Sequence, residues 1–173
     1  MLQIRPSQDG DIAAITTIYA HHVLHGTGTF EIDPPTEADM AQRRADVLAR
    51  GLPWLVAERD GVVLGFAYAN WFKPRPAYRF TAEDSIYVAD TARGSGVGRA
   101  LLQALVEQAQ ADGLRKLIAV IGDSANAGSI GLHRALGFTE VGVLRAMGWQ
   151  HGARRDIVLM EKPLGAADST APE

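Results

Sequence analysis

Hydrophobic residues recur at helical spacing through the first third of the chain. Between residues 9 and 24 the apolar positions lie mostly three or four residues apart, which predicts an amphipathic helix; they are Ile12, Ile15, Ile18, Tyr19 and Val23. A short strand at residues 2–5 precedes this helix. Residues 36–50 predict a second helix behind a weak capping box, and glycine, threonine and two adjacent prolines mark residues 25–35 as a loop.

The rest of the chain alternates between short strands and two longer helical stretches. Further strands are predicted at residues 54–58, 62–71, 85–88, 117–121, 139–144 and 154–162. Asp60-Gly61 joins the first two as a hairpin, and helices are predicted at residues 98–112 and 125–136. Three tryptophans in strand-like segments are predicted to be core or pocket walls: Trp54, Trp71 and Trp149. The element order β-α-α-β-β-β-α-β-α-β-β predicts an α/β fold, with a mixed sheet covered by helices on both faces.

Composition and charge narrow the class of protein. The chain has 173 residues, of which 47% are hydrophobic, and shows no break in composition, so one globular domain is predicted over residues 1–164. The small and polar residues 165–173 predict a disordered tail. The net charge is -3 and Arg154-Arg155 is too short to form a basic patch. We therefore expect neither nucleic acid nor a membrane surface as a partner.

Several features are missing from the sequence. No apolar run approaches the roughly 20 residues that span a bilayer, and the first ten residues hold no apolar signal core, so a cytoplasmic protein is expected. Cysteine is absent, which excludes disulfides and a thiol nucleophile. His21, His22 and His25 would need a further ligand to bind a metal, and no His-Glu-x-x-His pattern is present. No metal is expected.

A glycine-rich segment, Arg93-Gly94-Ser95-Gly96-Val97-Gly98, lies between a predicted strand and a predicted helix. Glycines let the backbone approach a ligand closely, and the amides at a helix N-terminus bind anions. Such a loop suits a pyrophosphate, although a glycine-rich turn without a ligand is the alternative. The Rossmann fingerprint fails because its third glycine would fall on Arg99 or Leu101, and the Gly-Lys-Ser/Thr of a P-loop is absent.

The pattern Arg-x-x-Gly-x-Gly in this place resembles the pyrophosphate loop of the GNAT acetyltransferase superfamily. Residues 126–138, which end in Leu-His-Arg-Ala-Leu-Gly-Phe, are similar to the second CoA-contacting helix of that superfamily. The resemblance covers about residues 2–164 and implies a single-domain GNAT fold with a splayed sheet and acetyl-CoA as co-substrate. The cofactor contacts that it implies are Ile86, Tyr87, Val88, Arg93, Gly94, Ser95, Gly96, Val97, Gly98, Asn126 and Ser129.

Acetyl transfer to an amine needs a base for the amine proton and stabilisation of an oxyanion. Without cysteine, the simplest route is direct attack in a ternary complex. Glu83 lies just ahead of the predicted CoA-binding strand, where its carboxylate could accept the proton directly or through a water. A solvated charge at a strand end is the alternative.

His133 occupies the helix position where many GNAT enzymes carry a tyrosine that protonates the leaving thiolate. A histidine there could donate that proton or orient the acceptor. The alternative is a structural histidine whose hydrogen bonds are satisfied inside the protein.

Six short segments narrow the resemblance to the phosphinothricin acetyltransferase group, which includes methionine sulfone and sulfoximine acetyltransferases. They are residues 29–31, 53–58, 78–83, 119–122, 132–138 and 142–145. The resemblance implies catalytic roles for Glu83 and His133, and a homodimer. It also implies an acceptor pocket formed by Phe30, Lys73, Arg75, Tyr78, Arg79, Val120 and Gly122.

Within that pocket, Arg75 and Arg79 could pair with a carboxylate or phosphinate, although each is equally explained as a surface charge. Pro74 and Pro76 differ from some family loops. The preferred function is N-acetylation of an amino acid of this type. Acetylation of protein N-termini and a non-catalytic CoA-sensing module are the alternatives.

Overall fold

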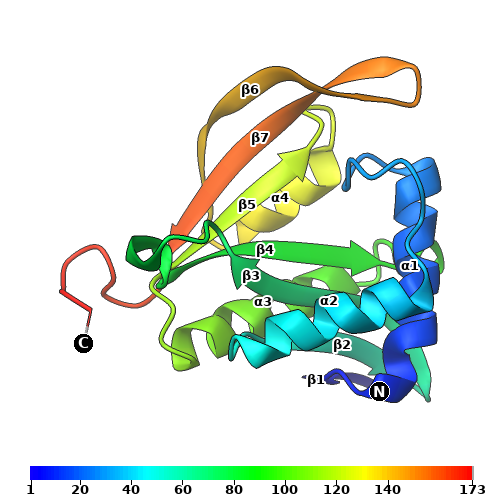
Figure 1. The fold of residues 1–173 in the computed structure, drawn as a ribbon, viewed down its shortest axis with the longest axis horizontal. Coiled ribbons are helices and arrows are strands. Elements are labelled where there is room, and N and C mark those ends of the chain that lie inside the picture. The colour runs from blue at the N-terminus through cyan, green and yellow to red at the C-terminus, as the bar shows by residue number, and fades with distance from the viewer. Residues whose placement is uncertain (173) are drawn as a thin grey trace.

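The computed structural model describes residues 1–172 and contains one seven-stranded sheet with the strand order β1-β2-β3-β4-β5-β7-β6 (Figure 1). The strands are β1 (Leu2–Pro6), β2 (Trp54–Arg59), β3 (Val62–Trp71), β4 (Thr81–Val88), β5 (Lys116–Gly122), β6 (Thr139–Gln150) and β7 (Ala153–Pro163). The α-helices are α1 (Ile12–His25), α2 (Glu37–Ala49), α3 (Val97–Ala111) and α4 (Ala127–Ala135). Short 3-10 helices cover η1 (Asp9–Asp11), η2 (Pro76–Tyr78) and η3 (Asp90–Ala92).

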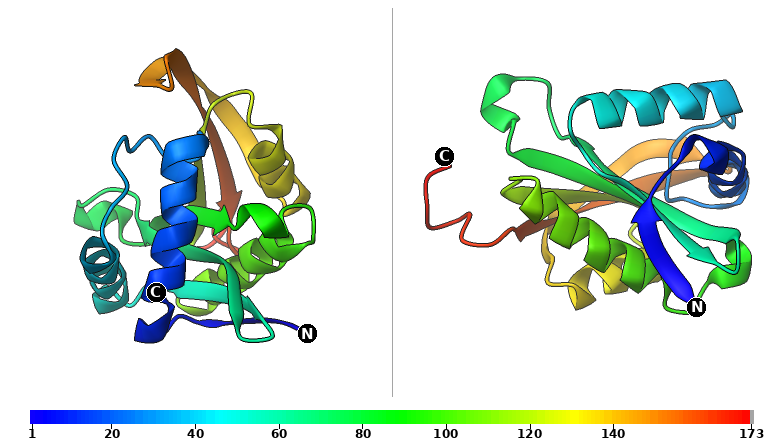
Figure 2. Two further views of the ribbon diagram at one scale, coloured as in Figure 1. Left: turned by 90° about the vertical axis from the view of Figure 1, so that its right-hand side faces the viewer. Right: turned by 90° about the horizontal axis from the view of Figure 1, so that it is seen from below.

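The sheet is mixed and has helices on both faces, as predicted. Strands β4 and β5 are parallel, and the other neighbouring pairs are antiparallel. Helices α1 and α2 pack on one face, whereas α3 and α4 pack on the other (Figure 2). The fold class predicted from the element order is therefore confirmed.

The sheet splays between β4 and β5. These strands pair only from Thr81 opposite Lys116 to Asp84 opposite Ala119. Beyond that point β4 stays paired with β3, and β5 stays paired with β7, so the two halves of the sheet diverge (Figure 1). The splay leaves two strand edges facing each other without a ladder between them.

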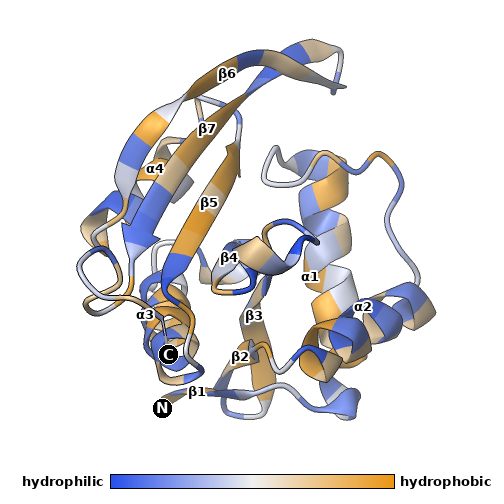
Figure 3. Ribbon diagram, turned by 60° about the vertical axis from the view of Figure 1, so that its left-hand side comes forward, coloured by the Kyte–Doolittle hydropathy of each residue, from blue (hydrophilic) through white to orange (hydrophobic). Residues whose placement is uncertain are grey.

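Apolar helix faces and central strands form the core. Leu101, Leu102 and Leu105 of α3 are fully buried against the sheet, and Ile15 of α1 is fully buried on the other face. Strand β5 is hydrophobic over most of its length (Figure 3). Burying one such side chain contributes about 1.5–3 kcal/mol. Within residues 1–172, none of the helices has the length and apolar character needed to cross a bilayer.

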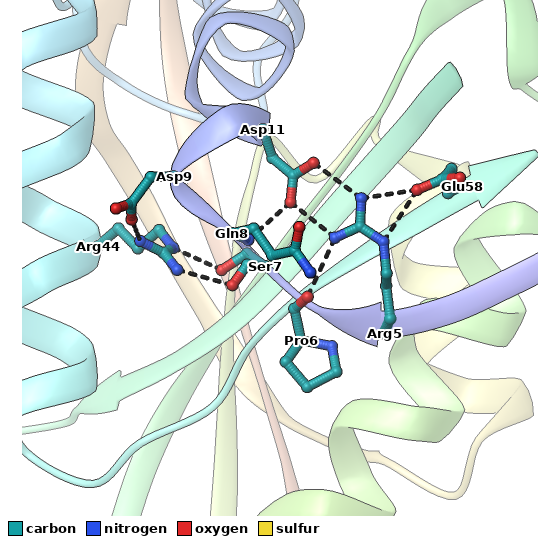
Figure 4. Close-up of polar contacts among 8 residues, drawn as sticks. All are labelled: Arg5, Pro6, Ser7, Gln8, Asp9, Asp11, Arg44 and Glu58. Carbon is teal, nitrogen blue, oxygen red and sulfur yellow. Dashed lines mark hydrogen bonds and ion pairs between the residues drawn. The ribbon is translucent and has the colours of Figure 1, made fainter. Parts of the chain in front are cut away.

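An N-terminal ion cluster joins β1, η1, α2 and β2 (Figure 4). The Arg5 guanidinium donates two hydrogen bonds of 2.8 Å to the Asp11 carboxylate, and also donates to Glu58 at 2.6 Å. Arg44 of α2 donates to the Ser7 hydroxyl at 2.6 Å and to Asp9 at 2.7 Å. The cluster fixes the first strand and the start of α1 against the second helix.

Two strands extend beyond their predicted bounds by more than one residue. Strand β4 begins at Thr81 rather than at residue 85, because Glu83 and Asp84 also pair with β3. The prediction began later because charged residues are uncommon in strands. Strand β6 continues to Gln150 rather than ending at residue 144. Its register with β7 shifts between Leu144 and Gly148, which interrupts the alternation of side chains.

The tryptophans do not share one environment. Trp54 is buried in the core as predicted. The prediction is wrong for Trp149, which is 67% exposed, because β6 is an edge strand whose outer face no element covers. Trp71 is also exposed, and the Arg50 guanidinium lies over its ring at 4.9 Å.

The segment predicted to be a disordered tail comes shortly after the end of β7 in the chain. Residues 165–168 form turns, and the Arg115 guanidinium donates to the Ala167 carbonyl at 3.2 Å and to the Thr170 hydroxyl at 2.7 Å. The disorder expected for residues 165–173 stays a prediction, and residue 173 itself lies outside the described residues.

Candidate active site

A cavity of about 860 Å³ occupies the splay between β4 and β5. Its walls come from these two strands, from the loop after α1, and from the starts of α3 and α4. It brings together most of the predicted site residues: Glu83, Ile86, Tyr87, Val88, Arg93, Gly94, Gly98, Val120, Gly122, Asn126, Ser129 and His133. The strands therefore gather at one place residues that the sequence separates by up to 50 positions.

The glycine-rich loop enters α3 in a conformation that few residues other than glycine adopt. Gly94 has φ +72° and Gly96, the N-cap of α3, has φ +84°. No side chain caps the helix, so the amides of its first turn have no partner within the helix. Such a helix start is suited to an anion, because its free amides and the helix dipole both favour negative charge.

The other predicted residues of this loop have separate roles. Arg93 is more than half exposed and its Nε lies 3.2 Å from the Asp90 carboxylate. The Ser95 hydroxyl donates to the Ala92 carbonyl at 2.6 Å, and the Val97 side chain is fully buried in the core. Among the residues of this loop, Arg93, Gly94 and Gly98 line the cavity, whereas Ser95, Gly96 and Val97 do not.

The facing strand edges offer backbone groups to an extended ligand. Past Asp84 the edge of β4 has no strand opposite it, and the same holds for β5 past Ala119. His22 donates to the Val88 carbonyl at 2.8 Å, which satisfies the last carbonyl of β4. The Tyr87 side chain packs edge-on against Tyr19 in the core, at 4.9 Å between ring centroids. The Tyr87 ring is therefore held in the core, while the residue still lines the cavity.

The strand register places the two predicted catalytic residues on opposite faces of the sheet. The Tyr87 ring contacts α1, so Tyr87 points to the sheet face that carries α1 and α2. Glu83 and Ser85 precede Tyr87 on β4 by four and two residues, so their side chains point to the same face. Asp84 lies on the other face, where His133 of α4 reaches it. Glu83, Asp84 and His133 all line the cavity, so residues from both faces meet at the splay.

Glu83 has the environment of a base. Its side chain is half-buried and forms no hydrogen bond within residues 1–172. Burial raises the pKa of the Glu83 carboxyl, the charge of Asp84 raises it further, and Lys73 partly offsets the shift. A carboxylate with a raised pKa accepts a proton more readily near neutral pH than an exposed one does.

His133 is bonded inside the protein through both ring nitrogens. Its side chain is 2% exposed; Nε2 lies 2.8 Å from Oδ2 of Asp84, and Nδ1 donates to the Ser129 carbonyl at 2.8 Å. Burial lowers the pKa of His133, but the hydrogen bond with Asp84, the charge of Asp84 and the hydrogen bond with the Ser129 carbonyl together outweigh burial and raise it. The geometry favours an orienting role for His133 over proton donation.

Sequence reasoning missed Asp84. Its side chain is 1% exposed, and its second oxygen, Oδ1, is buried with no hydrogen-bond partner within residues 1–172. The available signal was positional, because Ala82 and Ile86 alternate with Asp84 on one face of a strand. A charge between two apolar residues on the same face is a sign of a buried ion pair.

The predicted acceptor residues fall into two groups. Val120 and Gly122 line the cavity. A Cβ on Gly122 would lie 1.9 Å from the Thr27 carbonyl oxygen and 3.0 Å from the Phe30 ring, so the loop after α1 packs directly on this glycine. Phe30 also fits against Gly148, and it supports the cavity from behind rather than lining it.

The second group lies in residues 72–80, outside the cavity wall. Its side chains are exposed: Lys73, Arg75, Tyr78 and Arg79. Lys73 lies over the Phe72 ring at 5.3 Å, and Arg79 lies over Phe80 at 4.4 Å and donates to the Pro76 carbonyl. In this chain, two cationic side chains of the segment therefore lie over aromatic rings of the same segment.

A partly buried ion pair in the cavity wall was also missed. Arg155 of β7 and Asp123, which follows β5, both line the cavity, and Nη1 of Arg155 lies 2.9 Å from Oδ2 of Asp123. The sequence presents Arg155 only as half of an arginine pair too short for a basic patch. Its pairing depends on the antiparallel register of β5 and β7, which the sequence alone does not reveal.

Comparison with known proteins identifies the family. Residues 17–138 match the acetyltransferase (GNAT) family. The chain is 53% identical over 170 residues to a phosphinothricin N-acetyltransferase of Alcaligenes faecalis, covering 98% of this chain and 86% of the relative. It is 42% identical over 163 residues to an L-methionine sulfoximine/L-methionine sulfone acetyltransferase of Pseudomonas aeruginosa, covering 91% and 92%.

A solved structure agrees with this match. The crystal structure of a GNAT superfamily phosphinothricin acetyltransferase from Sinorhizobium meliloti, in complex with AcCoA, superposes with a TM-score of 0.96 at 45% identity. The superposition covers 99% of this chain and 93% of that one. Sequence, fold and site geometry therefore agree, and the chain belongs to the GNAT acetyltransferase family.

Proposed function

We propose that this enzyme transfers the acetyl group of acetyl-CoA to the α-amino group of a free amino acid of the phosphinothricin, methionine sulfoximine or methionine sulfone type. The observation that carries the proposal is the splay itself. It forms one cavity with a helix start suited to an anion, two free strand edges, and Glu83 where the strands part. Relatives named for these acceptors support the substrate class.

The residues present fit acetyl-CoA. The free amides at the start of α3, with Arg93 beside them, suit its pyrophosphate. The free edges of β4 and β5 suit the amides of its pantetheine arm, which can pair with a strand edge as a peptide does. Asn126 accepts from the Ser129 amide at 3.2 Å and so fixes the start of α4 on the cavity wall. When bound, acetyl-CoA supplies an acetyl group activated as a thioester.

Glu83 is the proposed base. When a neutral amine attacks the thioester carbonyl, a C–N bond forms and the nitrogen becomes positively charged, and the Glu83 carboxylate accepts a proton from it, directly or through a water. The C–S bond then breaks and CoA leaves as its thiolate. Because the chain has no cysteine, the amine attacks in a ternary complex with no acetylated thiol on the enzyme. The Asp84–His133 pair holds α4 against β4 where the strands part, and so positions the cavity wall.

Three further expectations go with the proposal. A homodimer and a role in resistance to such amino acids are implied by the resemblance, and a cytoplasmic location is expected from the sequence. These stay predictions, with oligomeric mass in solution as the measurement for the first.

Glu83→Gln tests the base. It should lower kcat by about 10²- to 10⁴-fold, the usual contribution of a general base, and leave the Kd of acetyl-CoA unchanged. In the wild type the rate should fall as the pH drops through the Glu83 pKa, at a higher pH than an exposed glutamate would give, and this limb should vanish in the variant. Glu107→Gln, at an exposed position on α3, is the control. Unchanged turnover in Glu83→Gln rules out this base.

An acceptor screen tests the function as a whole. Thiol release is measured with phosphinothricin, methionine sulfoximine, methionine sulfone, other free amino acids, and short peptides. Release with free amino acids of the proposed type supports the proposal. Release with peptides alone would replace it by acetylation of protein N-termini, and acetyl-CoA binding without release would indicate a CoA-sensing module.

A further inference from the structure

Arg155 of β7 is a cation in the cavity wall. Among residues 1–172, Arg93 and Arg155 are the arginine or lysine residues that line the cavity. Arg93 belongs to the loop that suits the pyrophosphate. Lys73, Arg75 and Arg79, which the resemblance implies for the acceptor, lie outside the cavity wall of the protomer. A negative group on the acceptor therefore has one arginine of this chain within the cavity.

The strand register places Arg155 on the same face as Glu83. Glu83 is opposite Ile118, and Gly122, four residues along β5, shares the face of Ile118. Gly122 is opposite Ile157, and Arg155 precedes Ile157 by two residues on β7. Side chains two residues apart on a strand point the same way, so Arg155 and Glu83 share the face of α1 and α2.

Two contacts fix the Arg155 guanidinium. Nη1 is 2.9 Å from Asp123, and Nε donates to the Gln150 carbonyl at 3.2 Å. The Gln150 side chain in turn donates to the Thr29 carbonyl at 2.8 Å, which ties this corner to the loop after α1. The Arg155 and Asp123 side chains are 20% and 14% exposed. Nη2 has no hydrogen-bond partner within residues 1–172, so a fixed guanidinium keeps unused donors at the cavity.

We propose that Arg155 binds the α-carboxylate of the amino-acid acceptor, an inference that rests on the proposed function. The α-carboxylate is the anionic group common to the proposed acceptors, because the side chains of methionine sulfone and sulfoximine carry no carboxylate or phosphinate. A planar guanidinium whose orientation is already set binds a carboxylate with little further loss of side-chain freedom. Asp123 offsets the charge of Arg155, so the contact provides geometry and selectivity more than long-range attraction.

The test compares an acid with its amide. Steady-state kinetics are measured with methionine sulfone and with methionine sulfone α-amide, which keeps the amine but lacks the carboxylate. Arg155→Gln should raise the KM of the acid about tenfold or more, the scale of a charge-assisted hydrogen bond, with a small change in kcat. The KM values of the amide and of acetyl-CoA should stay unchanged.

Two variants complete the design. Arg154→Gln changes the exposed neighbouring arginine on the other face of β7 and should leave all constants at wild-type values. Arg155→Lys keeps a positive charge beside Asp123 and so preserves the fold. A single ammonium cannot replace the planar set of guanidinium donors, so the preference for the acid over the amide should still fall.

The outcomes separate the two proposals. A rise in KM confined to the acid supports the role of Arg155. If Arg155→Gln changes the KM values of acid and amide equally, or changes neither, the role of Arg155 is overturned. The proposed function still stands in that case, provided that the wild-type enzyme turns over the acid. No turnover of either acceptor by the wild-type enzyme would overturn the proposed function, and the role of Arg155 with it.

Discussion

Asp84 and His133 form a buried pair in which every contact is made inside the protein. The two side chains lie 2.8 Å apart and are almost completely excluded from solvent. When one residue of a buried pair is replaced, its former partner stays buried without a hydrogen bond. The resulting loss of stability is larger than the loss when both residues are replaced by apolar ones. The pair therefore links the stability of the enzyme to the geometry of its cavity wall.

Asp84→Asn should lower the free energy of unfolding by about 3 kcal/mol, as expected for a broken buried pair. Because the His133 pKa is raised in the folded state, its charged form stabilises the fold fully below the ordinary histidine pKa of 6.5 and loses this effect as the pH rises through the folded pKa. Urea unfolding at pH 6 and pH 9 measures both effects.

Asp46→Asn, at an exposed position on α2, is the control for this variant. A double-mutant cycle with His133→Gln separates the coupling between the two residues from the loss of each alone. An Asp84→Asn protein as stable as the wild type would contradict the proposed importance of the pair.

Residues whose role depends on local chain order were predictable. The glycine-rich loop and Glu83 could be predicted as site residues because each sits at a fixed offset from a strand or helix, and their roles stay predictions. Asp84 and Arg155 were missed because their partners, His133 and Asp123, are brought to them only by the packing of α4 and the register of β7. A single sequence carries no record of such pairings.

At the scale of elements, the N-terminal ion cluster shows how charge fixes a strand that has little apolar surface. β1 is an edge strand, and Arg5 connects it to Asp11 of η1 and Glu58 of β2 (Figure 4). The Arg5 hydrogen bonds hold the Asp11 pKa below its ordinary value of 3.8. The cluster thus stabilises the fold at neutral pH more than in acid.

Asp11→Asn should destabilise the protein by about 2 kcal/mol, the scale of charge-assisted hydrogen bonds that are lost. This contribution is fully present above pH 3.8 and disappears as the pH falls through the lower pKa of the folded state, so variant and wild type should converge in strong acid. Thermal unfolding at pH 7 and at pH 3 checks both points.

Asp9→Asn is a matched control, because Asp9 also pairs with an arginine but its side chain is fully exposed. Exposed ion pairs contribute little, so this variant should unfold near the wild-type temperature. Equal losses in the two variants would show that burial is not what gives the Asp11 contact its weight.

Elements with one buried face were the easiest to predict. The helices have apolar residues three and four positions apart because only one side of each meets the sheet, and their predicted ranges agree with the structure to within a few residues. Strand ends were harder. β4 carries charges on both faces at its start, and β6 has an uncovered face, so neither shows the simple alternation that marks a half-buried strand.

At the scale of the whole molecule, the splay divides the sheet into two parts, β1–β4 and β5–β7–β6, joined by a ladder of four residue pairs. Each part has its own helices, and the free edges between them are not bridged by protein beyond Asp84 and Ala119. A ligand with amides along its length would complete the ladder.

Acetyl-CoA should slow hydrogen exchange of the backbone amides at residues 85–88 and 120–122. The amides in these segments that point away from β3 and β7 lie where the ladder is missing, and pairing with the pantetheine arm would protect them. Exchange measured by mass spectrometry with and without acetyl-CoA checks this, with β2, which is paired on both edges, as the internal reference. Protection of the glycine-rich loop alone would show that the strand edges do not hold the arm.

The unpaired strand edges also make the resistance of the enzyme to proteolysis depend on the concentration of acetyl-CoA. A ligand that binds only the folded state adds RT ln(1 + [L]/Kd) to its stability, and here that ligand would fill a gap in the main sheet. When acetyl-CoA is plentiful, the opened forms that proteases cleave become rarer, and when it is scarce they become more common. A cell short of acetyl-CoA would then clear this enzyme faster, so that its abundance follows the supply of the substrate it consumes.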